Sequence, residues 1–176
     1  MSLRELTHDL HTQAERQEFV KILFSGSIHP ELYAIYLKNQ HPMYEFLEVC
    51  AMKHGLLNGM PDIRRAPNIN ADYLELWEDK DRDPEILPVV SKYLDHIRSI
   101  MEQPEKLMAH IYVRHMGDLA GGQMISKKVP GKGLMYKFEN PDQLKAVIRE
   151  RINDDMADEA KVCFEFAIQF FKEMLD

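Results

Sequence analysis

The chain has 176 residues, 45% of them hydrophobic, and carries a net charge of −7 at neutral pH. This length suits a single domain, residues 1–176, with a sizeable buried core. The acidic balance argues against general attraction to nucleic acid or to anionic membrane surfaces. No uninterrupted apolar run reaches the roughly 18 residues of a membrane span, and the charged N-terminus lacks the apolar run of a signal peptide.

Apolar residues recur at helical spacing along most of the chain. Ser2 and Glu5 predict a capping box before the first helix. Pro30 opens a second helix, in which Pro42 should cause a kink or an interruption. The expected helices cover residues 3–24, 30–54, 71–79, 89–101, 104–128, 141–153 and 157–175.

No segment shows the alternation of apolar and polar residues that is typical of a strand, and residues 55–70 are interpreted as a surface loop. The expected fold is therefore all-α, a compact multi-helix bundle. Cys50 and Cys163 lack the spacing of a metal site and lie in apolar, helix-like surroundings. Two free thiols favour a reducing cytoplasm, and we expect a monomer that spans no membrane.

The most informative segment runs from Tyr112 to Gln123 and contains three glycines within an expected helix. Each glycine there costs about 0.5–1 kcal/mol relative to alanine, which calls for a compensating reason. Gly117 and Gly121 are four positions apart and share a face, with the Asp118 carboxylate beside it. Such a bare backbone suits a large planar ligand, but the same spacing also allows two helices to pack closely.

A second group of polar side chains lies near the N-terminus, where positions 4, 8, 11 and 15 share one helical face. They place Arg4, His8, His11 and Glu15 together. A neutral imidazole backed by an acid is suited to ligate haem iron. The alternative is that both histidines are surface polar residues of an amphipathic helix.

The two segments together resemble the haem oxygenase family. The string from His11 to Glu15 is similar to its proximal-helix signature, and the string from Tyr112 to Gln123 is similar to its distal helix. They stand in the family's order, about 105 positions apart. The resemblance extends from Leu6 to the final helix and implies a bundle of the haem oxygenase type.

The resemblance implies a role for individual residues around haem. His11 matches the axial iron ligand, and Glu15 would fix its ring. Gly117 and Gly121 match glycines whose backbone passes over the haem, and Asp118 matches a distal carboxylate that organises water. Further matches, to residues near the propionates, in the water network or along the cavity wall, are Arg4, His8, Tyr112, Arg114, Gly122, Lys145, Arg149 and Phe164.

Some of these matches have ordinary alternatives. Lys145 and Arg149 match cations that clamp the propionates, but they also suit a solvated helix surface. Phe164 is explained equally well by core packing. His115 stands where many relatives carry an aromatic residue, and Ala120 stands where many carry serine. These departures leave the shape of the expected pocket open.

The implied reaction is oxidative cleavage of haem, both cofactor and substrate, to biliverdin, carbon monoxide and ferrous iron, using dioxygen. The sequence has no flavin or nicotinamide fingerprint, so electrons must come from a partner. Residues 127–151 have a net charge of +4, which would attract an acidic donor such as ferredoxin. The alternatives are a non-catalytic haem-binding or transport protein, another enzyme on this bundle, or a structural module.

Overall fold

The computed structural model describes all residues from 1 to 176 and contains helices but no strands, as the sequence predicts. Ten segments are α-helical, and three short segments are π- or 3₁₀-helical. The α-helices are α1 (Leu3–Leu6), α2 (His8–Glu15), α3 (Glu18–Phe24), α4 (Pro30–Lys53), α5 (Ala66–Leu76), α6 (Pro88–Ile100), α7 (Pro104–Ile111), α8 (Gly117–Ser126), α9 (Pro141–Arg151) and α10 (Ala157–Glu173). The short segments are η1 (Tyr112–Met116, π), η2 (Leu134–Tyr136, 3₁₀) and η3 (Asp154–Met156, 3₁₀).

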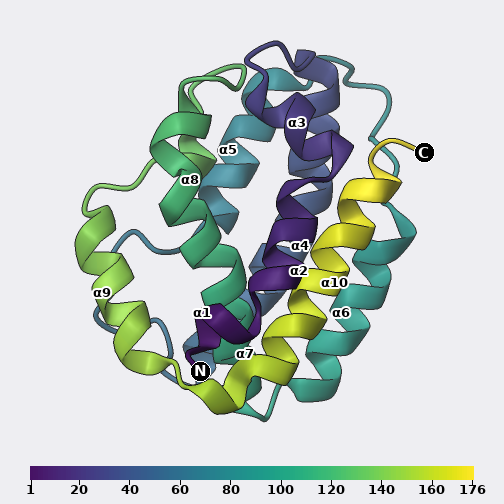
Figure 1. Cartoon of the computed structure of the whole chain (residues 1–176). Helices are drawn as coiled ribbons and strands as arrows, with labels where there is room; N and C mark the ends of the chain where they lie inside the picture. Colours follow the sequence, from purple (N-terminus) through teal and green to yellow (C-terminus); the bar gives the residue numbers. More distant parts are fainter.

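Helix α4 is the longest element and packs against α5, α6 and α7, while α10 packs against α2, α3, α6 and α7 (Figure 1). A single apolar cluster of 41 buried residues joins these helices. Helix α8 and the peripheral α9 lie to one side of the bundle in Figure 1, opposite α6 and α10. None of the helices is both long and apolar enough to pass through a membrane.

Prolines and polar caps set many of the helix starts. The helices α4, α6, α7 and α9 each begin at a proline, where the missing N–H costs nothing. Ser2 and Glu5 form the predicted capping box, since the Glu5 N–H donates to Ser2 Oγ at 3.2 Å and the two side chains meet at 3.0 Å. The apolar periodicity and the cap residues therefore predict most of the architecture.

The prediction of one continuous helix over residues 3–24 is wrong, because the three short helices α1, α2 and α3 take its place. Thr7 interrupts the first turn, and its Oγ1 donates to the Leu3 carbonyl at 2.9 Å. Such a bond back to residue i−4 bends helices. Gln17 then adopts an extended conformation between α2 and α3. The bends let α2 pack on α10 while α3 turns over the end of the bundle (Figure 1).

The predicted interruption at Pro42 is absent, since α4 runs unbroken from Pro30 to Lys53. An internal proline costs about 3 kcal/mol. Side chains on several sides of α4 are buried, including Leu37, Met43 and Leu47, and this burial offsets the cost.

The predicted loop 55–70 is too long, because α5 begins at Ala66 rather than near residue 71. The cause lies in a distant carboxylate. Glu48 on α4 accepts the backbone N–H groups of Arg65 at 2.6 Å and Ala66 at 3.1 Å. A cap supplied by a residue 17 positions earlier leaves no local sequence signal.

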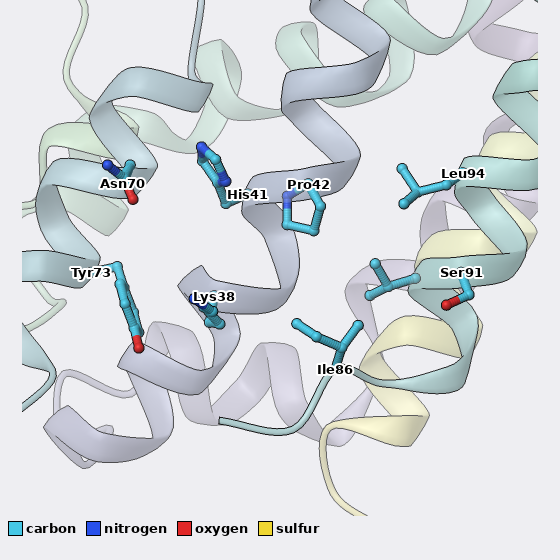
Figure 2. A pocket seen from close by; sticks show the side chains of 9 residues that line it. Lys38, His41, Pro42, Asn70, Tyr73, Ile86, Ser91 and Leu94 are labelled. Carbon is cyan, nitrogen blue, oxygen red and sulfur yellow. The ribbon is translucent and has the colours of Figure 1, made fainter. Parts of the chain in front are cut away.

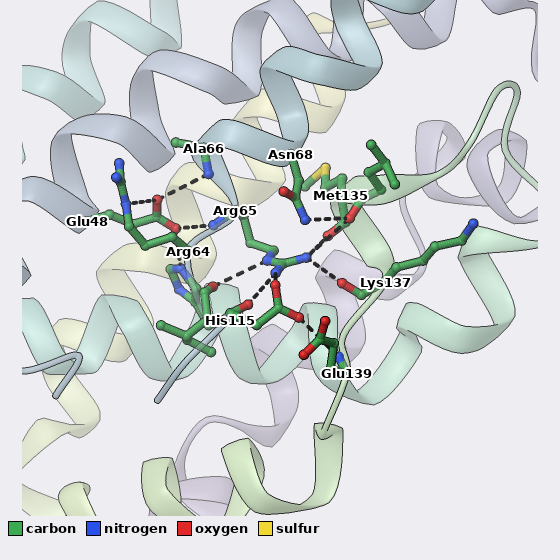
Figure 3. A network of polar contacts seen from close by, with 12 residues as sticks. Glu48, Arg64, Arg65, Ala66, Asn68, His115, Met135, Lys137 and Glu139 are labelled. Atoms are coloured by element: carbon green, nitrogen blue, oxygen red, sulfur yellow. Dashed lines mark hydrogen bonds and ion pairs between the residues drawn. The ribbon is translucent and has the colours of Figure 1, made fainter. Parts of the chain in front are cut away.

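Glu48 belongs to a buried polar network that holds three parts of the chain together (Figure 3). His115 Nε2 in η1 lies 2.8 Å from the Glu48 carboxylate. Burial would raise the pKa of Glu48, but the His115 bond and the two backbone donors lower it below its ordinary value. The carboxylate therefore stays ionised although its side chain is fully buried.

The neighbouring Arg65 is also fully buried and serves as a cross-link to the segment after α8 (Figure 3). Its Nη1 donates to the carbonyls of Met135 and Lys137, both at 2.9 Å. Its Nη2 donates to the Asp62 carbonyl. The guanidinium carbon lies 3.8 Å from the centre of the Phe138 ring. One side chain thus satisfies several carbonyls that would otherwise be buried without partners.

Replacing Arg65 by alanine should lower the free energy of unfolding by about 3–5 kcal/mol, because it leaves several buried carbonyls without a donor and removes the ion pair with Asp62. Urea denaturation of the haem-free protein measures this loss. The matched control is Lys21→Ala, which removes an exposed ion pair with Glu18 and should cost at most about 1 kcal/mol. Equal losses in the two variants would contradict the role given to Arg65.

Candidate functional site

The predicted helix 104–128 exists, but it is not uniformly α-helical. Helix α7 ends at Ile111, the π-turn η1 covers Tyr112–Met116, and α8 begins at Gly117. A π-turn inserts an extra residue and rotates the side chains that follow it; such turns are frequent at functional sites. Here the insertion comes directly before Gly117 and Asp118. The sequence predicted a helical segment with glycines and Asp118 here, but it did not predict the π-turn that changes the helical register before them.

The three glycines have different surroundings, which separates the two explanations that the sequence left open. A Cβ added to Gly117 would meet nothing within 4 Å, and this residue is exposed. A Cβ on Gly121 would lie 3.2 Å from Ile125 Cδ1, a flexible side-chain end of its own helix. The backbone at Gly117 therefore borders open space, as a flat ligand would require.

Gly122 behaves differently and fits the close-packing explanation. It is buried, and an added Cβ would lie 2.5 Å from the Tyr136 carbonyl oxygen of η2. Backbone in such contact cannot move aside cheaply. The structure thus gives Gly122 a packing role, and the cofactor contact expected from the sequence stays a prediction.

Asp118 lies beside this open backbone with its carboxyl group turned toward α4. The Tyr44 hydroxyl donates to Asp118 Oδ2 at 2.6 Å. Burial raises the pKa of Asp118 to about 6, although the Tyr44 bond and the nearby charges of His115, Arg65 and Arg114 oppose the rise. A carboxyl with this pKa exchanges its proton readily near neutral pH.

Arg114 lies within the same helix but is buried behind Asp118. Its Nε donates to the Tyr93 hydroxyl at 3.0 Å, and its guanidinium carbon lies 4.2 Å from the Tyr93 ring centre and 5.3 Å from the Tyr44 ring centre. Arg114 therefore orients the two tyrosines by cation–π contact and hydrogen bonding. Gln123, at the end of the glycine-rich segment, is exposed and makes no side-chain hydrogen bond.

The sequence analysis missed the α4 side of this site. Gln40, Tyr44 and Glu48 are spaced four apart, are all buried, and face Arg114, Asp118 and His115 respectively. Tyr44 also contacts the His115 ring edge-on, with centroids 5.4 Å apart. Polar residues repeated every four positions among the apolar residues of this helix were the available signal.

The predicted iron ligand His11 is on α2, with its side chain 49% exposed. Its Nε2 lies 2.8 Å from Glu15 Oε1. The ring also faces Phe164 of α10, with centroids 5.6 Å apart. Glu15 and Phe164 thus both contact the imidazole, and a ring with one nitrogen held by a carboxylate keeps the other available as a ligand.

Two of the predicted propionate-binding cations, Arg4 and Arg149, lie near Tyr112, which is half-buried in η1. Burial raises the pKa of Tyr112, while Arg4, a hydrogen bond with Thr7, and Arg149 lower it. Helix α9 contacts η1, which brings Arg149 to the side of the π-turn. Arg4, Lys145 and Arg149 form no ion pair. Unpaired cations grouped in this way are available to bind carboxylates.

His8 shares a shallow, open recess of about 510 Å³ with Ser2, Arg4 and Glu5. A separate cavity of about 380 Å³ lies between α4, α5 and α6, next to Pro42 and Tyr73 (Figure 2). None of the residues predicted from the sequence lines that second cavity. Side-chain chemistry, rather than cavity size, therefore identifies the candidate site.

Comparison with known protein families gives one match over almost the whole chain, the model described as "Heme oxygenase", which covers residues 1–173. The chain is 30% identical over 204 residues to "Heme oxygenase 2" from Macaca fascicularis, with 98% of this chain covered. It spans 64% of the length of that relative. "Heme oxygenase 1" from Synechocystis is 29% identical, with 98% of this chain and 82% of the relative covered.

Solved structures agree with this comparison. A structure titled as haem oxygenase from Leptospira interrogans superposes with a TM-score of 0.80 at 28% identity, covering 98% of this chain and 100% of that one. The haem complex of haem oxygenase-1 from Synechocystis superposes with a TM-score of 0.84 at 24% identity, covering 98% and 90%. The second likeness concerns the fold alone.

Replacing Asp118 by asparagine should stabilise the haem-free protein by about 1–3 kcal/mol above pH 6. The folded-state pKa of about 6 exceeds the unfolded value of about 3.9, so the folded protein holds this proton more tightly. The stability contributed by Asp118 is therefore complete below about pH 4 and is lost as the pH rises through about 6. Asparagine stays neutral and can still accept from Tyr44.

Urea midpoints measured from pH 4 to pH 8 test this expectation. The difference between Asp118→Asn and wild type should be small at pH 4 and should grow to a plateau above pH 6. Glu165→Gln, at an exposed position on α10, provides the control and should follow the wild-type profile. A flat difference for Asp118→Asn across this range would show that its carboxyl is not held in the buried state described.

Proposed function

The chain belongs to the haem oxygenase family, and on this premise we propose that it cleaves haem oxidatively to biliverdin, carbon monoxide and ferrous iron. Dioxygen is the oxidant, and an external donor supplies the electrons. The observation that carries the proposal is the uncovered backbone at Gly117 next to the Asp118 carboxyl. A site with this combination can accept a flat macrocycle and hold a proton beside it.

The residues of this chain fit haem in three respects. The half-exposed His11 imidazole offers a nitrogen for iron, with Glu15 as its hydrogen-bond partner. The unpaired cations Arg4, Lys145 and Arg149 would hold the propionates. The exposed, side-chain-free Gly117 would lie against the ring, and Phe164 beside His11 would add apolar contact.

Bound haem supplies both the iron that activates dioxygen and the carbon that is oxidised. The protein contributes position and proton control. Tyr44 holds one oxygen of Asp118, and the other accepts no hydrogen bond from the protein. Asp118 can therefore orient a water molecule and exchange a proton through it, while Tyr44, which Arg114 contacts, fixes the carboxyl in place.

Gly117 contributes by having no side chain. Any Cβ at this position would project into the open space that the ligand is proposed to occupy. The absence of a side chain would allow the helix backbone to lie against the ring of bound haem. A histidine at position 11 would donate less electron density to iron than a thiolate would.

A non-catalytic haem carrier is the second candidate. It would use the same His11 and the same cations to bind haem. It would have no need for a half-buried carboxyl with a pKa of about 6 beside the glycine. Haem binding therefore does not distinguish the oxygenase from the carrier, whereas haem degradation does.

The electron donor is proposed to be an acidic protein such as ferredoxin. Four lysines of the segment 127–151 are exposed: Lys127, Lys128, Lys132 and Lys137. None of them forms an ion pair with an acidic side chain. Arg151 is excluded from this surface because it donates to the carbonyls of Leu56 and Asn58. Free lysines around one edge attract a negatively charged partner.

The two buried free thiols fit a reducing compartment, and we place the reaction in the cytoplasm.

Added haemin should produce a sharp Soret band with the wild-type protein, and a reductant with dioxygen should then convert it to a bilin spectrum. His11→Ala should lose the axial histidine signature and regain it when free imidazole is added. Asp118→Ala should keep the Soret band and lose most bilin formation. A wild-type protein that binds haem without degrading it would favour the carrier, and full bilin yield from Asp118→Ala would remove that residue from the mechanism.

Raising the salt concentration from about 50 to 500 mM should slow turnover supported by ferredoxin, because the Debye length falls from more than about 10 Å to a few ångströms. Turnover with ascorbate as the reductant should change little. Lys127→Glu combined with Lys128→Glu should weaken ferredoxin-supported turnover in the same selective way. Equal salt sensitivity with both reductants would argue against docking through these lysines.

A further inference from the structure

Two histidines and a glutamate from three helices meet at one point that the proposed reaction does not use. His96 of α6 and His110 of α7 both direct Nε2 at the same oxygen of Glu159 on α10. The two distances are 2.6 Å and 2.7 Å to Glu159 Oε2. All three candidate ligand atoms lie within 4.8 Å of one another.

This set has the chemistry of a transition-metal site. Two imidazole nitrogens and one carboxylate oxygen suit zinc, which binds them at about 2.0–2.2 Å. Tetrahedral ligands at those distances lie about 3.3 Å apart. The two nitrogen–oxygen distances need to open by less than about 1 Å to reach that spacing, and the two histidine nitrogens already lie within 4.8 Å of each other. Side-chain rotations can supply such adjustments.

The surroundings orient the ligands in the way that metal sites require. His110 Nδ1 lies 2.7 Å from the Tyr93 hydroxyl, and that hydroxyl accepts from Arg114 Nε at 3.0 Å. The bond at Nδ1 fixes the His110 ring and can hold its proton there, which frees Nε2 for an ion. Phe166 packs against both His96 and Tyr93 and provides an apolar wall.

The cluster is also accessible from the surface. The side chain of His110 is fully buried, whereas those of Glu159 and His96 are 11% and 25% exposed. An ion can therefore enter past His96, and a fourth position toward solvent remains for water. Cys163, one turn after Glu159, is not part of the group.

We propose that His96, His110 and Glu159 form a binding site for one divalent transition-metal ion, best suited to zinc. The ion replaces the hydrogen bonds that now join the three side chains and links α6, α7 and α10 directly. Helix α7 leads into the π-turn and Asp118, so the ion braces the first half of the helix that carries the candidate haem site. The site is separate from His11 and does not depend on haem.

Titration of the haem-free protein with zinc chloride, followed by calorimetry, tests the proposal. Wild type should bind one zinc ion per chain and gain several degrees in Tm. His96→Gln should weaken this binding by at least about 10-fold, and Glu159→Gln should do the same while keeping a side chain that can hydrogen-bond both histidines. Retention of the far-ultraviolet circular dichroism spectrum shows that each variant is folded.

Two controls exclude other histidines. In the wild-type protein His29 caps α4, because its Nδ1 accepts the Glu31 N–H. His29→Asn removes the imidazole but keeps a residue that caps helices well. Zinc binding by this variant should be unchanged. His11→Ala should also retain it, which separates this site from the one proposed for haem. No zinc binding by wild type, or equal loss in His29→Asn and His96→Gln, would overturn the proposal.

Cobalt(II) gives a spectroscopic test of the ligand set. The cobalt-loaded protein should show the visible bands of four-coordinate cobalt and no sulfur-to-metal charge-transfer band, because Cys163 is not a ligand. His96→Gln should abolish the visible bands. A thiolate band, or a spectrum unaffected by His96→Gln, would contradict the proposed ligands.

Discussion

The buried carboxylate of Glu48 is the interaction on which the geometry of the site depends. It caps the start of α5 through two backbone N–H groups and holds His115 in the π-turn. A charge without solvent is costly unless every lone pair is used, and here donors from separate segments use them. The same group therefore determines where α5 begins and how the π-turn lies on α4.

This constraint reaches the candidate reaction centre through short steps. His115 contacts the Tyr44 ring. The Tyr44 hydroxyl in turn donates a hydrogen bond to Asp118, which follows His115 by three residues. The π-turn supplies the register that places Asp118 over α4 while Gly117 faces open space. Partial burial of the Asp118 carboxyl and exposure of the Gly117 backbone thus arise from the same local irregularity.

Local signals predicted much of this protein. Apolar spacing and prolines at helix starts predicted the helical class and most helices, and the two motifs predicted the family. Two features had no local signal, the cap of α5 by Glu48 and the π-turn, because each depends on tertiary packing rather than on propensity. The bend at Thr7 does have a local cause, the bond from its hydroxyl to the Leu3 carbonyl, but threonine occurs in many helices without ending them. The roles of His11, Asp118 and the propionate cations remain predictions.

The two explanations for a glycine-rich helix apply to different residues of the same helix. Gly122 is fixed by the Tyr136 carbonyl, which leaves no room for a methyl group, whereas nothing in the protein fills the space at Gly117. The two positions are therefore under separate evolutionary constraints. A descendant that abandoned its ligand would be free to acquire a side chain at Gly117, but it would still need glycine at 122 to fold.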